Sequence, residues 1–473
     1  MIRDRQARLR APEDTQTEHL RGLSRRSLLL GGGFALAAVP ATARAATRIA
    51  GLRGTIEASE FGVRPNAGDD QSALLQQAIN ASVERGRALF LPSGHYPVAN
   101  LRLPGGARLV GIPGQTWFDY LGGGHLVYSE KGAAIGLKGI HFDGGNKHLG
   151  DYTPALLHFS DAADLSLESC TISGSAKTGL ALDRCSGRII ACTVSGARQA
   201  GIRSVEATGL SITDCHVHDC ANAGILVYRW SEGEDGTLVS GNRVERIAAK
   251  DGGTGQNGNG INVFRAHGVI VSGNRVTDCA FSAIRSNAGS NIVINGNSCL
   301  RSGETAIYSE FAFQGAVIAD NLVDGGTIGI SIANFLDGGR LATCSGNVVR
   351  NLTVDGPYPA EVQGFGIGIA VEADTALTGN VIEEAPRFGI HMGWGPYLRN
   401  VTATSNVIRA CPTGIGVTVV DGAGPALIAN NIIQDASRGA IIGHRWKEAV
   451  TKDLTQVGAE AFPHLTIQGN VAG

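Results

Sequence analysis

The stretch VIVSGNRVTDCAFSAI, from Val269 to Ile284, contains two short patterns that recur along the chain. Its Ser-Gly-Asn at 272–274 occurs again at 240–242 and 345–347, and Gly-Asn also occurs at 296–297, 379–380 and 469–470. A small residue followed by Ile, here Ala283-Ile284, comes a few residues later. Such recurrence indicates a repeat, and the spacing of its members indicates which kind.

The first pattern, a small residue followed by Asn or Cys, recurs at intervals of 22 to 39 residues. Its second residues are Cys170, Cys192, Cys215, Asn242, Asn274, Asn297, Asn321, Asn347, Asn380, Asn406, Asn431 and Asn470. The second pattern, Gly or Ala before an aliphatic residue, lies between them, as in Gly224-Ile225. A minimum period of 22 residues is too short for a βαβ unit and suits three short strands with three turns. The sequence therefore predicts an all-β fold, a single-stranded right-handed parallel β-helix.

This fold gives the recurring Asn and Cys residues a structural role. Asn accepts the left-handed backbone conformation of a tight turn, and stacked Asn amides can hydrogen-bond along the solenoid axis. The nine cysteines include three at the Asn position, and no CxxC spacing occurs. We therefore expect buried, unpaired thiols that serve as small apolar side chains.

Composition gives no hint of nucleic acid or an anionic membrane surface as a partner. The chain has 473 residues with 67 Gly, 17% charged residues and a formal net charge of -2. This balance gives no indication of nucleic acid as a partner. No segment of the mature chain is expected to span a membrane.

The N-terminus has the features of an export signal. Residues 24–45, SRRSLLLGGGFALAAVPATARA, contain paired Arg25 and Arg26, a short apolar run and a small-residue cleavage pattern ending at Ala45. They resemble a twin-arginine signal. The expected organisation is a signal peptide at 1–45, an N-terminal cap with first strands at 46–110, and the β-helix with a C-terminal cap at 111–473. The mature protein would be periplasmic or secreted, and the twin-arginine export machinery would be a partner.

The region after the signal carries a family resemblance. Asp69 or Asp70 is expected to cap a helix whose apolar face includes Leu75 and Ile79, and Pro92-Ser-Gly-His-Tyr96 follows it. An amphipathic helix here would cover the open end of the solenoid. This stretch resembles the N-terminal motif of pectate-lyase-like, or pectin-lyase-like, β-helix enzymes. With the signal and the repeats, nearly the full chain resembles the TAT-translocated repetitive protein family. That resemblance implies fold and export, but no particular chemistry.

The second pattern also predicts which side chains point outward. If the aliphatic residue points inward, the residues one and three positions later face solvent. On this basis one patch of adjacent coils carries Arg285, Tyr308 and Glu310 as candidate catalytic residues. The candidate substrate-binding residues, on the same face or just beyond it, are Tyr228, Arg229, Trp230, Asn262, Phe264, Arg265, Asn287, His391 and Trp394. Aromatic rings with arginines suit an acidic or envelope polysaccharide.

Several possibilities stay open at this point, among them a purely structural envelope protein that would not depend on these residues. In a polysaccharide lyase, Tyr308 or Arg285 would be the base, and Asn262, Asn287 or Arg265 would neutralise the uronate carboxylate. In a glycoside hydrolase, Glu310 would act with Glu372, which faces the groove if Ile369 rather than Ile367 is the inward residue of its coil. In a non-catalytic solenoid that binds glycan or protein, Arg285, Tyr308 and Glu310 would form a surface ion-pair and stacking network.

The remaining signals are weaker. No cofactor is predicted, no metal-ligand motif occurs, and calcium is an alternative that no motif supports. Three insertions, at 229–236, 248–260 and 352–366, are expected to form loops at the rim of the groove. Residues 444–464 are expected to include a C-terminal cap.

Overall fold

A computed structural model describes residues 54–473 except Thr254 and residues 360–363. The predicted signal peptide therefore lies outside the described residues. The described chain is a parallel β-helix built from three long sheets, which we name A, B and C. Sheet A contains sixteen strands, from β1 (Ile56–Glu57) to β45 (Leu465–Gln468), and sheet B contains fifteen, from β3 (Gly94–Val98) to β46 (Val471–Ala472).

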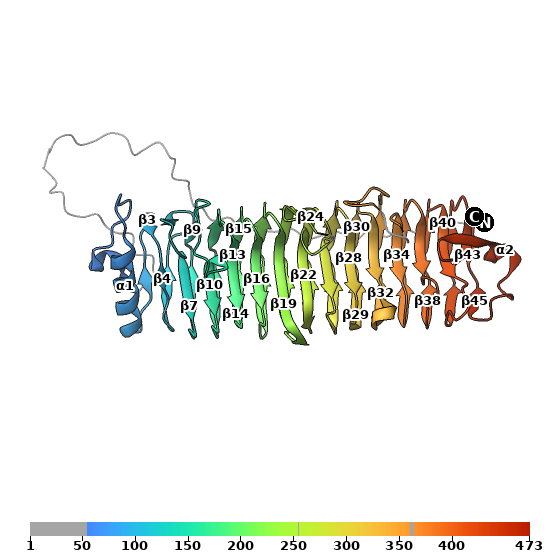
Figure 1. Cartoon of the computed structure of the whole chain (residues 1–473), viewed down its shortest axis with the longest axis horizontal. Helices are drawn as coiled ribbons and strands as arrows, with labels where there is room; N and C mark the ends of the chain where they lie inside the picture. The colour runs from blue at the N-terminus through green and yellow to red at the C-terminus, as the bar shows by residue number, and fades with distance from the viewer. Residues whose placement is uncertain (1–53, 254, 360–363) are drawn as a thin grey trace, which may run out of the picture. The chain divides into compact units, whose positions relative to one another are not determined.

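Sheet C has fifteen strands, and several of them cross the middle of the solenoid in Figure 1. They are β4 (Leu101–Arg102), β7 (Val127–Glu130), β10 (Ala155–Ser160), β13 (Thr178–Asp183), β16 (Ala200–Val205), β19 (Ala223–Glu234), β22 (Asn259–His267), β25 (Ile284–Asn287), β28 (Thr305–Glu310), β31 (Ile328–Ile332), β34 (Ile367–Val371), β37 (Phe388–Met392), β40 (Thr413–Thr418), β43 (Gly439–Arg445) and β44 (Glu448–Asp453). One coil passes through sheets B, C and A in turn, as in β12 (Thr171–Ser173), β13 and β14 (Gly187–Ile190). The predicted right-handed β-helix is confirmed.

The second sequence pattern is explained by crowding at the corner between sheets B and C. A Cβ atom added to Gly260 would lie 2.4 Å from Cγ1 of Val276, and one added to Gly224 would lie 2.7 Å from Cγ1 of Val244. Only a very small residue fits beside the inward valines of the next coil. The following Ile is fully buried in each of these coils, as Ile225 and Ile261 show.

The recurring Asn residues form a continuous ladder along the corner between sheets A and B. Asn274 donates from its backbone N–H to Oδ1 of Asn297 at 2.9 Å and from Nδ2 to the same oxygen at 3.0 Å. Its Nδ2 also donates to the carbonyl of Val239 at 2.9 Å. The same contacts repeat in each coil from Asn242 to Asn431, and Asn470 ends the ladder.

The expected left-handed conformation belongs to a different residue. Positive φ angles occur at the residue before the ladder Asn, such as Gly241, Gly273 and Gly296, and not at the Asn itself. The positive φ angle is therefore taken by the preceding residue, most often Gly, which tolerates it, and the Asn supplies the amide group of the ladder.

The nine cysteines are unpaired and buried, as expected. Cys170, Cys192 and Cys215 extend the ladder toward the N-terminus, and the backbone N–H of Cys215 donates to Oδ1 of Asn242 at 2.9 Å. Thiols replace amides in the coils of this end.

The helix α1 (Ser72–Glu84) packs on the core with Leu75, Ala78 and Ile79 fully buried. Its N-cap residue is Gln71 rather than Asp69 or Asp70, although Oδ1 of Asp70 accepts the Ser72 N–H at 2.8 Å. At the other end, β44 pairs antiparallel with β43, and the short helix α2 (Leu454–Val457) follows.

One predicted loop is a strand instead. Residues 229–234 of the first insertion continue β19, and after a register shift Gly233 and Glu234 pair with Ala266 and His267 of β22. The sequence RWSEGEDG favours a turn, but hydrogen bonds to the neighbouring strand β22 keep it extended.

Candidate functional site

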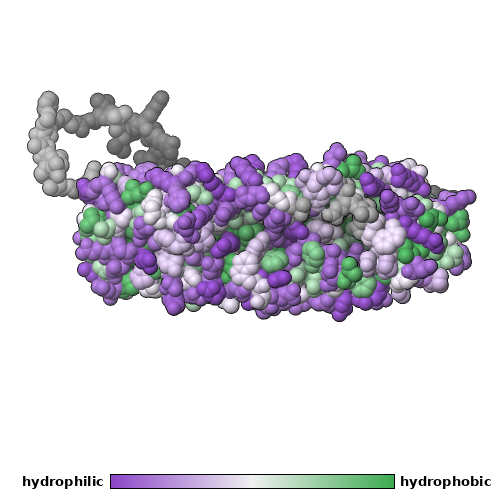
Figure 2. Space-filling model, in the orientation of Figure 1, coloured by the Kyte–Doolittle hydropathy of each residue, from purple (hydrophilic) through white to green (hydrophobic). Residues whose placement is uncertain are grey.

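The outward residues of sheet C form straight rows because the strands are in register. Ile261, Ile284 and Ile307 are direct partners on β22, β25 and β28. One position further, the outward row contains Asn262, Arg285 and Tyr308. Two positions beyond it, a second row contains Phe264, Asn287 and Glu310. Figure 2 shows hydrophilic and hydrophobic residues mixed along the face seen in Figure 1, with its middle recessed.

A pocket of about 360 Å³ lies on these rows. Seven residues line it: Tyr228, Gln256, Asn262, Phe264, Arg285, Asn287 and Phe311. Five of them were predicted as site residues from their outward positions. The other two come from segments that break the repeat, Gln256 from the insertion at 248–260 and Phe311 from the turn after β28.

The three predicted catalytic residues lie together but are already engaged with one another. Nε of Arg285 donates to Oε1 of Glu310 at 2.6 Å, and Nδ2 of Asn287 donates to the same oxygen at 3.0 Å. The Arg285 guanidinium carbon lies 5.7 Å from the centre of the Tyr308 ring. Glu310 is only 3% exposed, and this burial raises the pKa of its carboxyl despite the nearby Arg285. The trio thus forms an ion pair with an adjoining ring.

Tyr228 forms one wall of the pocket. Its hydroxyl accepts a hydrogen bond from Nδ2 of Asn262 at 3.1 Å, and its ring centre lies 5.5 Å from that of Phe264. Burial raises the pKa of Tyr228 to about 12, so this hydroxyl stays protonated at neutral pH and is a poor base.

Other predicted binding residues lie beside the pocket. Arg229 is ion-paired with Glu206 at 2.7 Å, and Trp230 is 61% exposed. The guanidinium carbon of Arg265 lies 4.9 Å from the Phe264 ring centre, and its Nη1 donates to the Trp230 carbonyl at 3.0 Å. These residues can form a rim but do not line the pocket.

His391 and Trp394 belong to a separate cluster, three coils from Tyr308 along sheet C. The rings of His391 and Trp394 are 6.4 Å apart, and Trp394 meets Trp446 edge-on at 5.4 Å. Burial lowers the pKa of His391 to about 3. This imidazole is neutral at physiological pH.

The register of Glu372 is settled, because Ile330 pairs with Ile369. Glu372 follows β34 on the groove side, two strands from Glu310 and about 10 Å away at the usual strand spacing. Its Oε2 accepts the Phe335 backbone N–H at 2.6 Å, and burial raises its pKa. The two carboxylates proposed for hydrolysis are therefore both bound to groups of the chain itself.

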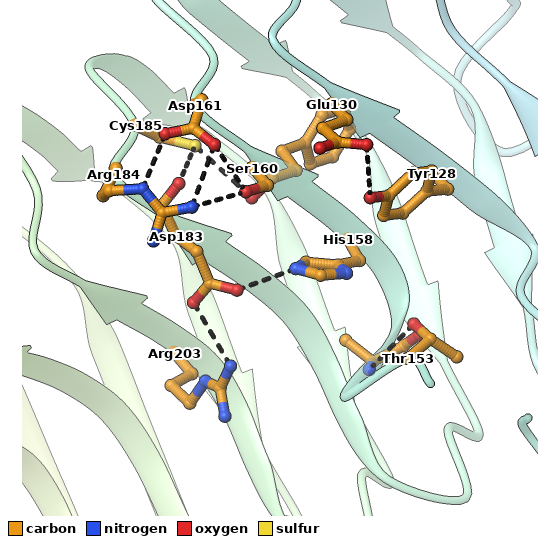
Figure 3. A network of polar contacts seen from close by, with 12 residues as sticks. Tyr128, Glu130, Thr153, His158, Ser160, Asp161, Asp183, Arg184, Cys185 and Arg203 are labelled. Atoms are coloured by element: carbon orange, nitrogen blue, oxygen red, sulfur yellow. Dashed lines mark hydrogen bonds and ion pairs between the residues drawn. The ribbon is translucent and has the colours of Figure 1, made fainter. Parts of the chain in front are cut away.

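A second polar cluster, which the sequence patterns missed, lies toward the N-terminal end of sheet C (Figure 3). We call Tyr128, His158, Asp183 and Arg203 the histidine–aspartate network. Nε2 of His158 lies 2.7 Å from Oδ2 of Asp183, and Arg203 contacts Oδ1 of Asp183 at 3.2 Å. The Tyr128 ring meets His158 edge-on, with centres 5.3 Å apart. The coil of His158 lacks the second pattern, since Leu156 and Leu157 stand in its place, so the outward position of His158 was not identified.

The charge on Asp183 sets the direction of its hydrogen bond with His158. Burial acts to raise the pKa of Asp183, but the hydrogen bond from His158 and the charge of Arg203 leave it below its usual value. An ionised carboxylate only accepts hydrogen bonds, so Nε2 of His158 is the donor in this contact. Nδ1 is buried and has no hydrogen-bond partner among the described residues.

No group of three or more His, Cys, Asp or Glu side chains in the described part of the chain is placed to hold a metal ion. Within the same residues, no helix is long and apolar enough to cross a membrane.

The comparisons with known proteins concern the fold. The protein-family model described as the right handed beta helix region matches residues 121–246. No curated protein matches the sequence. Among solved structures, the pre-mature gene product 12 of bacteriophage phi29 superposes with a TM-score of 0.53 and 15% identity over 84% of this chain and 58% of that one. This chain thus spans a little over half of the phage protein.

The A-module of the mannuronan C-5 epimerase AlgE6 from Azotobacter vinelandii superposes with a TM-score of 0.50 and 15% identity, over 88% of this chain and 99% of the module. An N-terminal fragment of the phi29 protein gives a TM-score of 0.51, also at 15% identity, over 88% of this chain and 70% of the fragment. At such low identity the shared feature is the fold, and the chain is a right-handed parallel β-helix like these proteins.

Proposed function

We propose that the protein binds a polysaccharide along sheet C, with one sugar unit held in the pocket around Asn262 and Arg285. The pocket itself carries this proposal. It combines three aromatic rings, three amide side chains and one guanidinium within about 360 Å³. Aromatic rings cover the apolar faces of sugars, and amides match their hydroxyl groups. The proposal includes the predicted export of the protein, so that it would meet glycans outside the cytoplasm.

Phe264→Ala tests where the glycan binds. Removal of one ring from the pocket is expected to weaken binding of a short oligosaccharide by about tenfold or more, because a buried aromatic contact contributes about 1–2 kcal/mol. Affinity electrophoresis in gels containing a panel of plant, algal and bacterial polysaccharides would first find a ligand. Isothermal titration calorimetry with its oligosaccharides would then compare the variants.

Trp446→Ala is the matched control. Trp446 is 46% exposed and follows β43, seven strands beyond β22 on the same sheet. Its loss should leave binding of a short ligand unchanged. Equal weakening by both variants, or no binding to any polysaccharide, would contradict the proposal.

The histidine–aspartate network favours a second candidate function, β-elimination at a uronate unit. The reaction needs a base beside the sugar carboxylate, and a cation to stabilise the charge that develops there. Nδ1 of His158, which has no hydrogen-bond partner among the described residues, is the candidate base, and Arg102, which pairs with Tyr128 across β4 and β7, is the candidate cation. One structure with the same fold is named as an epimerase that acts at C-5 of mannuronan. Because Nδ1 is buried, the reaction would also require a local opening of sheet C at this end.

The ultraviolet absorbance of unsaturated uronate products tests this second function. If it is correct, the mature protein will produce an absorbance rise with at least one uronate polymer, and His158→Gln will lower the rate by about a hundredfold or more. Tyr308→Phe should retain the activity, because Tyr308 lies outside the network. Loss of activity in Tyr308→Phe with full activity in His158→Gln would instead favour the originally predicted patch.

A further inference from the structure

The pocket contains one charged side chain, and that charge is already balanced. Of the seven lining residues only Arg285 is ionised, and its Nε is 2.6 Å from Oε1 of Glu310. Glu310 lies on the neighbouring strand β28, and its side chain is 3% exposed. The positive charge is therefore offset before any ligand enters. A carboxylate in the pocket would meet a guanidinium whose charge Glu310 already offsets.

The hydrogen-bonding atoms of the pocket also disfavour a carboxylate. The two terminal nitrogens of Arg285 have no hydrogen-bond partner among the described residues, so they can donate to a ligand. Among the residues that the structure describes, the carbonyl oxygen of Asn262 is buried without a partner, and Nδ2 of Asn287 donates to Glu310. The pocket thus presents donors and acceptors side by side. A hydroxyl group both donates and accepts, whereas a carboxylate only accepts and would face these carbonyl oxygens.

We infer that the pocket recognises an uncharged, hydroxyl-rich sugar unit, and that the charge of Glu310 excludes an acidic one. This inference rests on the proposed function, glycan binding along sheet C, and adds the class of unit that the pocket takes. It replaces the expectation that the aromatic rings and arginines of this face suit an acidic polysaccharide. The inference concerns the pocket alone, since the histidine–aspartate network lies on other strands of the sheet.

The test compares each acidic oligosaccharide with its own carboxyl-reduced form, which differs only in charge and in one oxygen. Oligogalacturonate, oligomannuronate and oligoglucuronate of equal length, with their reduced counterparts, would be titrated into the protein by calorimetry. The wild-type protein is expected to bind a reduced form at least about tenfold more tightly than the acidic form. Glu310→Gln keeps the shape and an acceptor oxygen but removes the charge. It should raise affinity for the acidic form by about tenfold and change affinity for the reduced form little.

Glu383→Gln is the control with the same change of charge. Glu383 is on β36 (Val381–Glu383) of sheet B, where it pairs with Arg409 at 2.6 Å, away from the pocket. This variant should keep the wild-type ratio. An equal or stronger affinity of the wild-type protein for the acidic forms would overturn the inference and leave glycan binding intact. Absence of binding to any form would overturn both. If Glu310→Gln fails to fold, the ratio of the wild-type affinities for the reduced and the acidic oligosaccharides still tests the inference.

Discussion

In each coil from Asn242 onward, the turn between sheets A and B depends on two neighbouring residues. The first, most often Gly, takes the positive φ angle, and the second supplies the amide of the ladder. Sequence patterns identified both positions but assigned the backbone conformation to the wrong one. Asn is so often left-handed in turns that its presence was sufficient to suggest that role. Its burial and repeated amide contacts show why no other polar residue replaces it in these coils.

Asn321→Ala is expected to destabilise the protein strongly. Oδ1 of Asn321 accepts the backbone N–H and one Nδ2–H of Asn297, each at 3.0 Å, and Nδ2 of Asn321 donates to the Ile294 carbonyl at 3.0 Å. Alanine would leave these buried groups without partners. Since each orphaned group costs about 1–3 kcal/mol, the free energy of unfolding should fall by about 3 kcal/mol or more.

Urea titration followed by circular dichroism measures this change. Asn80→Ala serves as the control, because Asn80 is exposed on α1 and accepts one hydrogen bond from Gln76. Its effect should stay within about 0.5 kcal/mol. A loss below about 1 kcal/mol in Asn321→Ala would show that the ladder contributes little to stability.

At the scale of strands and loops, the sequence was informative wherever a strand followed the repeat. The pleat alternates side chains with a period of two, so one inward Ile per coil located both outward rows. This is why Tyr228, Asn262 and Arg285 were identified as neighbours from residues far apart in the sequence. Where periodicity ended, the prediction ended too. Gln256 lines the pocket, but it lies in an insertion whose conformation the repeat does not predict. Residues 229–234 extend β19 because they pair with the neighbouring strand β22.

The candidate site shows a further limit of sequence patterns. They placed Arg285, Tyr308 and Glu310 in one patch, but they could not show that Arg285 and Glu310 neutralise each other. That ion pair depends on the directions and the burial of both side chains, which result from the packing of the coils that contain β22, β25 and β28. The histidine–aspartate network was missed for a related reason. His158 and Asp183 are 25 residues apart and meet only because β10 and β13 pair in register.

At the scale of the whole solenoid, each coil contacts mainly the coils before and after it, so stability is expected to vary along the axis. The buried thiols allow this to be measured. Burial raises the pKa of Cys299 to about 12 and that of Cys411 to about 11, and both side chains are inaccessible. We expect no labelling of the nine cysteines in the native protein by a thiol reagent at neutral pH, and full labelling in concentrated urea.

In urea below the unfolding midpoint, Cys411 should be labelled before Cys299, because its coil lies nearer the end of the solenoid and can open without the coils at the centre. Mass spectrometry of peptides after timed labelling would give the order. Simultaneous labelling of both cysteines would indicate that the solenoid opens as one cooperative unit.

The Asn ladder has a consequence for how such a protein can change over generations. Successive Asn residues of the ladder are as few as 23 and as many as 39 residues apart, yet each stacks on the next with the same contacts. The ladder contacts hold neighbouring coils in register, and they do not depend on the number of residues between two ladder positions. Insertions or deletions in one loop can therefore occur without shifting any other coil. The outward residues of sheet C can change one coil at a time during evolution, while the ladder and the core keep their structure.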